Sequence, residues 1–136
     1  MAARAGLADA FIELHGPLGA GKTTFARHLL HALGIIGAIK SPTYALLEPY
    51  RAAADRGSFE IAHCDFYRFD DAQEWEDAGF REVFASPGLK LVEWPEKAAA
   101  LLPPCDLRIE IAPHDNDDAR DVRFEAFSPR GAALLL

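Results

Sequence analysis

A glycine-rich run near the start of the chain constrains the fold more than any other feature. Residues 16–23 read Gly-Pro-Leu-Gly-Ala-Gly-Lys-Thr and match the pattern G-x-x-x-x-G-K-[ST] in full. The run follows an alternating segment, Phe11–His15, that predicts a strand. It precedes a stripe of apolar residues that predicts a helix from Lys22 to a C-terminal cap at Gly34. This strand–loop–helix order is the context that the motif requires, so the sequence predicts a phosphate-binding loop.

Each fixed residue of this loop has a chemical reason. Glycines let successive backbone N–H groups turn toward phosphate oxygens, and the positive end of the following helix adds to their effect. Lys22 is expected to reach the β- and γ-phosphates, the Thr23 hydroxyl to coordinate Mg²⁺, and Thr24 to line the phosphate side. The expected nucleotide contacts are therefore Gly16, Leu18, Gly19, Ala20, Gly21, Lys22, Thr23 and Thr24.

Three further residues are candidates for the chemistry around a γ-phosphate. Glu93 follows the short apolar strand predicted over residues 89–92, and a P-loop site takes a carboxylate from such a position to hold Mg²⁺ or its water. Asp65 follows the strand predicted over residues 59–64, where a cap or turn role is an equal alternative. Thr43 lies in a Ser-Pro-Thr turn and either senses the γ-phosphate, as switch loops do, or is a solvated turn hydroxyl.

Three other residues are predicted to have a structural role and not to contact a ligand. His63 alternates with Ile61 on one strand face, which predicts a packed histidine. Trp75 and Trp94 are more often core or interface residues than ligand contacts.

Strands and helices alternate along the remainder of the chain, which predicts a single α/β domain over residues 1–136. We expect a three-layer, P-loop NTPase-like sheet with helices on both faces and an antiparallel C-terminal hairpin. The expected elements after the first helix are a strand through Leu47, a polar connection over 50–58, a strand over 59–64, a helix that starts at Asp70-Asp71 and runs through Val83, a strand over 89–92, a helix from Pro95 to Pro103, and paired strands over 107–111 and 122–126.

Composition and charge narrow the class of protein further. Half of the 136 residues are hydrophobic and 26% are charged, which is typical of a globular domain. Residues 65–136 carry 8 basic and 16 acidic residues, so the chain is expected to reach any nucleic acid through a partner. The two cysteines lack metal-type spacing, and no leader or membrane span is indicated, so we expect a cytoplasmic protein.

Four segments, taken in order, resemble the TsaE family over nearly the whole chain, from Phe11 to Arg130. They are Gly-Pro-Leu-Gly-Ala-Gly-Lys-Thr-Thr from Gly16, Lys-Ser-Pro-Thr-Tyr from Lys40, His-Cys-Asp-Phe-Tyr-Arg from His63 and Leu-Val-Glu-Trp-Pro-Glu from Leu91. The first segment is generic to P-loop proteins, whereas the four together are specific. The resemblance implies the ATPase component of bacterial tRNA threonylcarbamoyladenosine synthesis. It implies ATP and Mg²⁺ as cofactors, the TsaD and TsaB proteins as partners, and tRNA held mainly by that assembly.

The resemblance also implies roles for single residues. Thr43 would belong to a switch-like loop, Asp65 would be an active-site acid needed for activity, and Glu93 would be the Mg²⁺-side carboxylate. Trp94 and Arg120 would lie near the nucleotide. Family members carry a further strand and helix ahead of the loop strand, and these are expected to be missing here.

Two other classes of P-loop protein are alternatives. A small-molecule kinase needs an acceptor pocket and an arginine-rich lid, to which Arg51 and Arg56 are the nearest approach. A GTP switch needs an Asn-Lys-x-Asp segment, and the single asparagine, Asn116, is followed by Asp117. Hydrolysis by the chain alone is expected to be slow, because Arg68 is only a weak candidate for an arginine finger.

Overall fold

A six-stranded sheet carries the loop predicted to bind phosphate. The computed structural model describes residues 6–39, 42, 46–54, 57–116 and 118–136, and the structural statements below concern these residues. The strands are β1 (Phe11–His15), β2 (Leu47–Ala54), β3 (Gly57–Asp65), β4 (Leu89–Glu93), β5 (Leu107–Pro113) and β6 (Arg120–Ala126). Their order across the sheet is β2-β3-β4-β1-β5-β6, so β1 lies at the centre.

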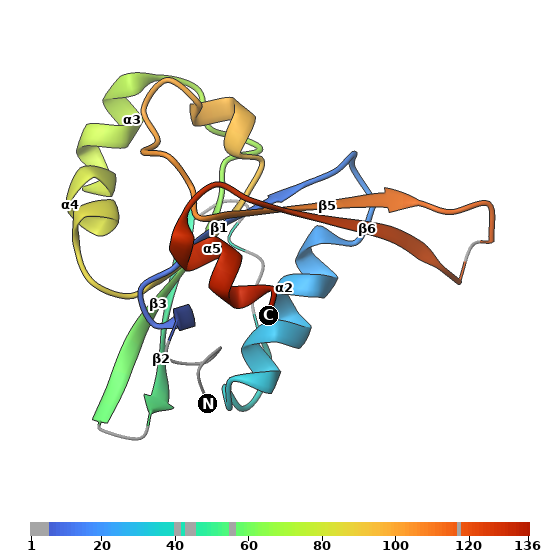
Figure 1. Cartoon of the computed structure of the whole chain (residues 1–136). Helices are drawn as coiled ribbons and strands as arrows, with labels where there is room; N and C mark the ends of the chain where they lie inside the picture. Colours follow the sequence, from blue (N-terminus) through green and yellow to red (C-terminus); the bar gives the residue numbers. More distant parts are fainter. Residues whose placement is uncertain (1–5, 40–41, 43–45, 55–56, 117) are drawn as a thin grey trace.

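The four inner strands run parallel, and each edge strand runs antiparallel to its neighbour. Parallel strands end at the same edge of the sheet, so β1, β3 and β4 bring their last residues together. The antiparallel pair β5–β6 confirms the predicted C-terminal hairpin and extends away from β2 and β3 in Figure 1.

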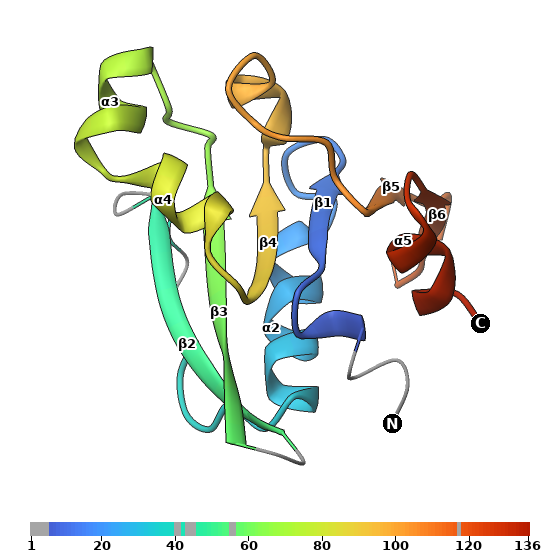
Figure 2. The ribbon, with the colours of Figure 1, turned by 60° about the vertical axis from the view of Figure 1, so that its left-hand side comes forward.

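Helices cover both faces of the sheet, as predicted. On one face, α2 (Lys22–Ala32) packs its buried Ala26 and Leu30 against alternate residues of the central strands, such as Ile12 and Leu14 of β1. The other face packs against α3 (Ala72–Asp77) and α4 (Phe80–Ala85), which contribute Trp75 and Phe80. Figure 1 shows these helices on opposite sides of β1, and Figure 2 shows α2 behind β4 and β1.

The connection predicted over residues 50–58 is wrong, because most of it is strand. β2 pairs with β3 from Leu47 opposite Cys64 to Ala54 opposite Gly57. An edge strand tolerates exposed charges, so Arg51 and the alanines that follow it gave this segment the composition of a loop.

The single helix predicted from Asp70-Asp71 through Val83 is two helices. The side chain of Asp71 caps α3, with hydrogen bonds from Gln73 N (2.9 Å) and Glu74 N (3.1 Å), so the predicted start is confirmed. Gly79 then adopts a left-handed conformation (φ 72°), which breaks the helix before α4 begins.

The helix predicted from Pro95 to Pro103 is also wrong, because the structure has only a short 3₁₀ helix there, η1 (Pro95–Ala98). The chain ends with α5 (Pro129–Leu134), whose residue Leu134 packs against the α2 side of the core. Among the described residues, every helix is too short or too polar to span a bilayer.

Candidate functional site

The glycine-rich loop joins the end of β1 to the start of α2, as predicted. At Gly16, a Cβ atom would lie 2.3 Å from the carbonyl oxygen of Ile111 on β5, so only glycine fits this turn. Gly21 precedes α2 with a φ of 108°, another conformation that favours glycine. The loop therefore lies close against β5, and the N-terminal end of α2 opens onto the edge where the parallel strands end.

A cavity of about 360 Å³ opens in front of this loop. Its lining combines the loop with residues from the ends of β3 and β4. The lining residues are Leu18, Gly19, Gly21, Lys22, Thr23, Thr24, Asp65, Tyr67, Arg68, Glu93 and Trp94. Residues predicted from separate parts of the sequence thus meet at one cavity, together with Tyr67, which the sequence analysis did not select.

The lining of the cavity includes a buried carboxylate, that of Glu93. Thr23 Oγ1 donates a hydrogen bond of 2.7 Å to Glu93 Oε1. Asp65 is the register partner of Glu93 on the neighbouring strand, and its Oδ1 accepts a hydrogen bond of 2.9 Å from Tyr67 N. Strand pairing therefore places two carboxylates beside the loop threonine, at the end of α2 that favours negative charge.

His63 contacts the same carboxylate from the sheet. Its Nε2 lies 2.7 Å from Glu93 Oε2, and its side chain is fully buried. The prediction of a packed histidine is confirmed, but its contact with Glu93 was missed. The alternation of His63 and Asp65 along β3 was the available signal, because residues two apart on a strand share a face.

The loop lysine is almost fully buried. Lys22 Nζ donates a hydrogen bond to the carbonyl oxygen of Gly16 and lies 3.3 Å from the centroid of the Trp94 ring. Burial lowers the pKa of this ammonium from its ordinary value of 10.5, while the nearby carboxylates of Glu96 and Glu93 oppose the shift. The buried ammonium is therefore held beside the loop by a backbone oxygen and the face of an aromatic ring.

Within the described part of the chain, three predicted residues do not line the cavity: Gly16, Ala20 and Arg120. Arg120, at the start of β6, contacts the loop backbone, because its Nε donates a hydrogen bond of 3.0 Å to the carbonyl oxygen of Ala20. Gly16 likewise contributes backbone, through the oxygen that accepts from Lys22. Thr43, like residues 40–41, lies outside the residues that the structure describes.

The oxygen donors of the cavity fit a magnesium ion held jointly with a phosphate group. Mg²⁺ is usually bound through one or two carboxylates, waters and substrate phosphates rather than by a cage of protein ligands. Glu93 and the Thr23 hydroxyl are such donors, and Asp65 lies next to them. In the described part of the chain, no group of three or more His, Cys, Asp and Glu residues could hold a metal without such help.

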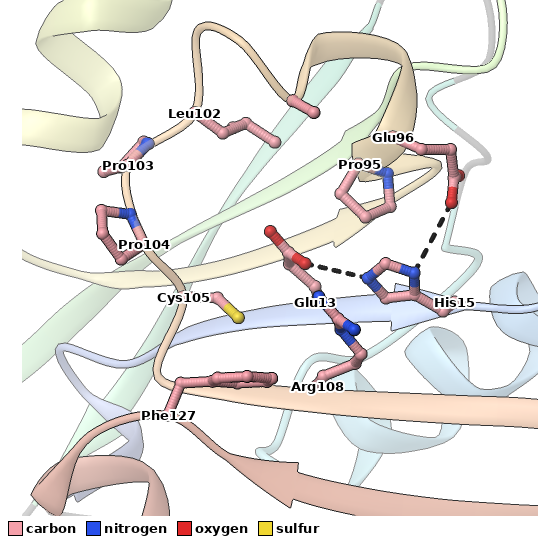
Figure 3. Close-up of a pocket in the computed structure, with 11 residues that line it drawn as sticks. Glu13, His15, Pro95, Glu96, Leu102, Pro103, Pro104, Cys105, Arg108 and Phe127 are labelled. Atoms are coloured by element: carbon pink, nitrogen blue, oxygen red, sulfur yellow. Dashed lines mark hydrogen bonds and ion pairs between the residues drawn. The ribbon is translucent and has the colours of Figure 1, made fainter.

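A second cavity, of about 470 Å³, lies on the face of the sheet away from α2. In Figure 3, Glu13 and His15 project from β1 between the segment after β4 and Phe127. Glu13 Oε1 lies 2.9 Å from His15 Nε2, and Arg108 lies over the ring of Phe127 with its Cζ 5.0 Å from the ring centroid. This cavity contains none of the loop residues, so it is separate from the site described above.

Comparison with known proteins identifies a family that matches most of the chain. The family model described as "Threonylcarbamoyl adenosine biosynthesis protein TsaE" matches residues 1–122. The TsaE protein of Haemophilus influenzae is 39% identical over 124 residues, which cover 91% of this chain and 75% of that protein. The TsaE protein of Bacillus subtilis is 38% identical over 119 residues, covering 88% and 71% of the two chains.

A solved structure has the same fold. The crystal structure of Bacillus subtilis YdiB superposes with a TM-score of 0.74 at 30% identity and covers 98% of this chain and 80% of that one. The resemblance predicted from four sequence segments is thus confirmed over most of the chain. The chain belongs to the TsaE family of threonylcarbamoyl adenosine biosynthesis proteins.

Proposed function

We propose that the chain binds Mg·ATP at the loop cavity and hydrolyses it slowly, in support of tRNA threonylcarbamoyladenosine modification. The observation that carries the proposal is the hydrogen bond of 2.7 Å between Thr23 and Glu93 at the start of α2. This contact joins the two oxygen donors that a P-loop site uses for its metal. The matching relatives are named as tRNA threonylcarbamoyladenosine biosynthesis proteins, which supports this process for the chain.

The residues of the cavity have different roles in the transfer of the γ-phosphoryl group to water. Backbone N–H groups of the loop and the Lys22 ammonium stabilise the charge that develops on the γ-phosphoryl oxygens. Thr23 and Glu93 hold Mg²⁺, which when bound neutralises phosphate charge. Asp65 positions the attacking water or a water of the metal shell. Trp94 and Thr43 lie near the nucleotide in this proposal, the latter in a loop that responds to the γ-phosphate.

Partner proteins accelerate the reaction in this proposal. Among the described residues that line the cavity, Arg68 is the one arginine. The chain as a whole carries more acidic than basic residues. An arginine supplied by a partner typically raises hydrolysis by a P-loop protein about 10³-fold or more. We therefore propose that the TsaD and TsaB proteins complete the active assembly and provide most of the contact with tRNA.

The test is to measure release of free phosphate from ATP, with and without the TsaD–TsaB pair. We expect slow release by the chain alone and a large increase with the pair. Glu93→Gln is expected to abolish the increase, whereas Glu125→Gln, a change at an exposed position on β6, serves as the matched control. Equal and fast rates in both conditions would contradict the partner dependence. A phosphorylated acceptor would indicate a kinase, and preferential competition by GTP would indicate a GTP switch.

A further inference from the structure

We infer that His63 is a positioning residue that fixes the Glu93 carboxylate for metal binding. This inference rests on the proposed function, because it assigns His63 a part in the Mg²⁺ dependence of the loop cavity.

The geometry holds the carboxylate at both of its oxygens. Glu93 Oε2 lies 2.7 Å from His63 Nε2, and Glu93 Oε1 accepts a hydrogen bond of 2.7 Å from the Thr23 hydroxyl. A carboxylate only accepts hydrogen bonds, so Nε2 is the ring nitrogen that carries the hydrogen. The three side chains come from β3, β4 and α2, and they form one chain of contacts from the sheet to the loop.

Packing alone does not account for a histidine at this position. His63 is fully buried, and in the described part of the chain its Nδ1 has no hydrogen-bond partner. A buried polar atom without a partner costs free energy, which an apolar side chain of similar size avoids. Its strand neighbours on the same face, Phe59 and Ile61, are apolar core residues. The contact with Glu93 is therefore the interaction that a histidine makes here and that an apolar side chain could not make.

Fixing the carboxylate has a direct consequence for a metal site. A ligand that is already oriented loses less freedom when the metal binds, and outer partners of metal ligands typically contribute about 10- to 100-fold in metal affinity. Without the N–H of His63, Glu93 keeps the Thr23 hydroxyl as its described side-chain partner and can rotate out of the orientation that the metal needs. The contribution of His63 is thus to metal affinity and not to the phosphate contacts of the loop.

Three substitutions separate this role from packing. His63→Leu removes the donor, His63→Met is a second apolar variant in case the leucine variant does not fold, and His63→Gln keeps an N–H near the position of Nε2. Ile61→Val is the matched control, because it alters the core on the same strand face without touching Glu93. Thermal melting of all variants gives the stability change that each substitution causes.

The measurement is nucleotide affinity by calorimetry, as a function of Mg²⁺ concentration and in EDTA. We expect His63→Leu and His63→Met to raise the half-saturating Mg²⁺ concentration about 10- to 100-fold. His63→Gln should recover most of that loss, and Ile61→Val should show none. Affinity in EDTA should be the same for all variants.

An unchanged Mg²⁺ dependence in the apolar variants, or an equal loss of affinity in EDTA, would overturn the inference and leave His63 a core residue. Failure of the unsubstituted chain to bind nucleotide under either condition would overturn the proposed function itself, and the inference with it.

Discussion

The ammonium of Lys22 lies 3.3 Å from the centroid of the Trp94 ring while it donates a hydrogen bond to Gly16 of its own loop. The cation is thus held within the cavity by groups that a phosphate would replace or supplement. This relationship links the loop to the segment after β4, because Trp94 directly follows Glu93. Burial of the Lys22 ammonium also disfavours its charged form in the folded protein.

Lys22→Met is expected to abolish nucleotide binding without lowering the melting temperature. The folded protein disfavours the charged form, since burial lowers the pKa of Lys22 below 10.5. Between the folded pKa and 10.5 the unfolded chain binds more protons, so the unsubstituted protein gains stability relative to the methionine variant as pH rises toward 10.5. Denaturant unfolding at pH 7 and pH 10 measures this difference. Lys97→Met, at an exposed position, is the control, and a larger advantage of the lysine at pH 7 would contradict the prediction.

Arg120→Ala is expected to weaken nucleotide binding modestly, by loosening the loop. The hydrogen bond from Arg120 Nε to Ala20 supports the loop backbone, and loss of such a bond costs about 1 kcal/mol, or roughly fivefold in Kd. Arg123→Ala on the same strand is the control, because Arg123 pairs with Glu110 and does not contact the loop. Calorimetric titration with Mg·ATP distinguishes the two variants, and equal affinities would contradict the support role.

Asp65→Asn is expected to slow hydrolysis while leaving nucleotide affinity near that of the unsubstituted chain. The amide oxygen can still accept from Tyr67 N, so the local turn is kept, but the negative charge that we propose orients water is lost. Loss of such a group typically costs about 100-fold or more in rate. Single-turnover phosphate release and nucleotide Kd are measured on the same samples. If the hydrolysis rate and the nucleotide affinity fall together, Asp65 contributes to nucleotide binding instead. Asp121→Asn on β6 is the control for the loss of one negative charge.

Both cysteines are expected to resist thiol reagents in the folded protein. Burial raises the pKa of the Cys64 thiol, and burial together with the Glu13 carboxylate raises the pKa of Cys105 to about 12. At pH 8 almost no thiolate is present at either site. A colorimetric thiol assay should therefore detect no reaction until denaturant is added, whereas Ser58→Cys, at an exposed position of β3, should react at once. Rapid native labelling of the unsubstituted chain would contradict the buried positions.

The parts of the site that the sequence predicts are those encoded locally. The loop is a contiguous motif whose residue types follow from phosphate chemistry, and Glu93 ends a short apolar strand that stands out without knowledge of its neighbours. The Asp71 cap likewise depends on residues within four positions of it. These features need no information about which strands pair.

The features that were missed depend on tertiary placement. Leu47–Ala54 is a strand because it pairs with β3 at an edge, and its sequence of proline, arginine and alanines has no strong strand pattern of its own. The contact of His63 with Glu93 exists only because β3 and β4 are neighbours in register, which the sequence does not specify. Tyr67 joins the cavity for the same reason, since its backbone N–H donates to Asp65 at the end of β3 and its ring packs at a tilt against the ring of Trp94.

The most direct test of the account is a calorimetric titration of the folded chain with ATP in the presence of Mg²⁺. The account predicts saturable heat at one site per chain, and no such heat for Lys22→Met under the same conditions. If a sample with a cooperative melting transition gives no heat with ATP or any other purine triphosphate, the loop cavity is not a nucleotide site and the account is contradicted.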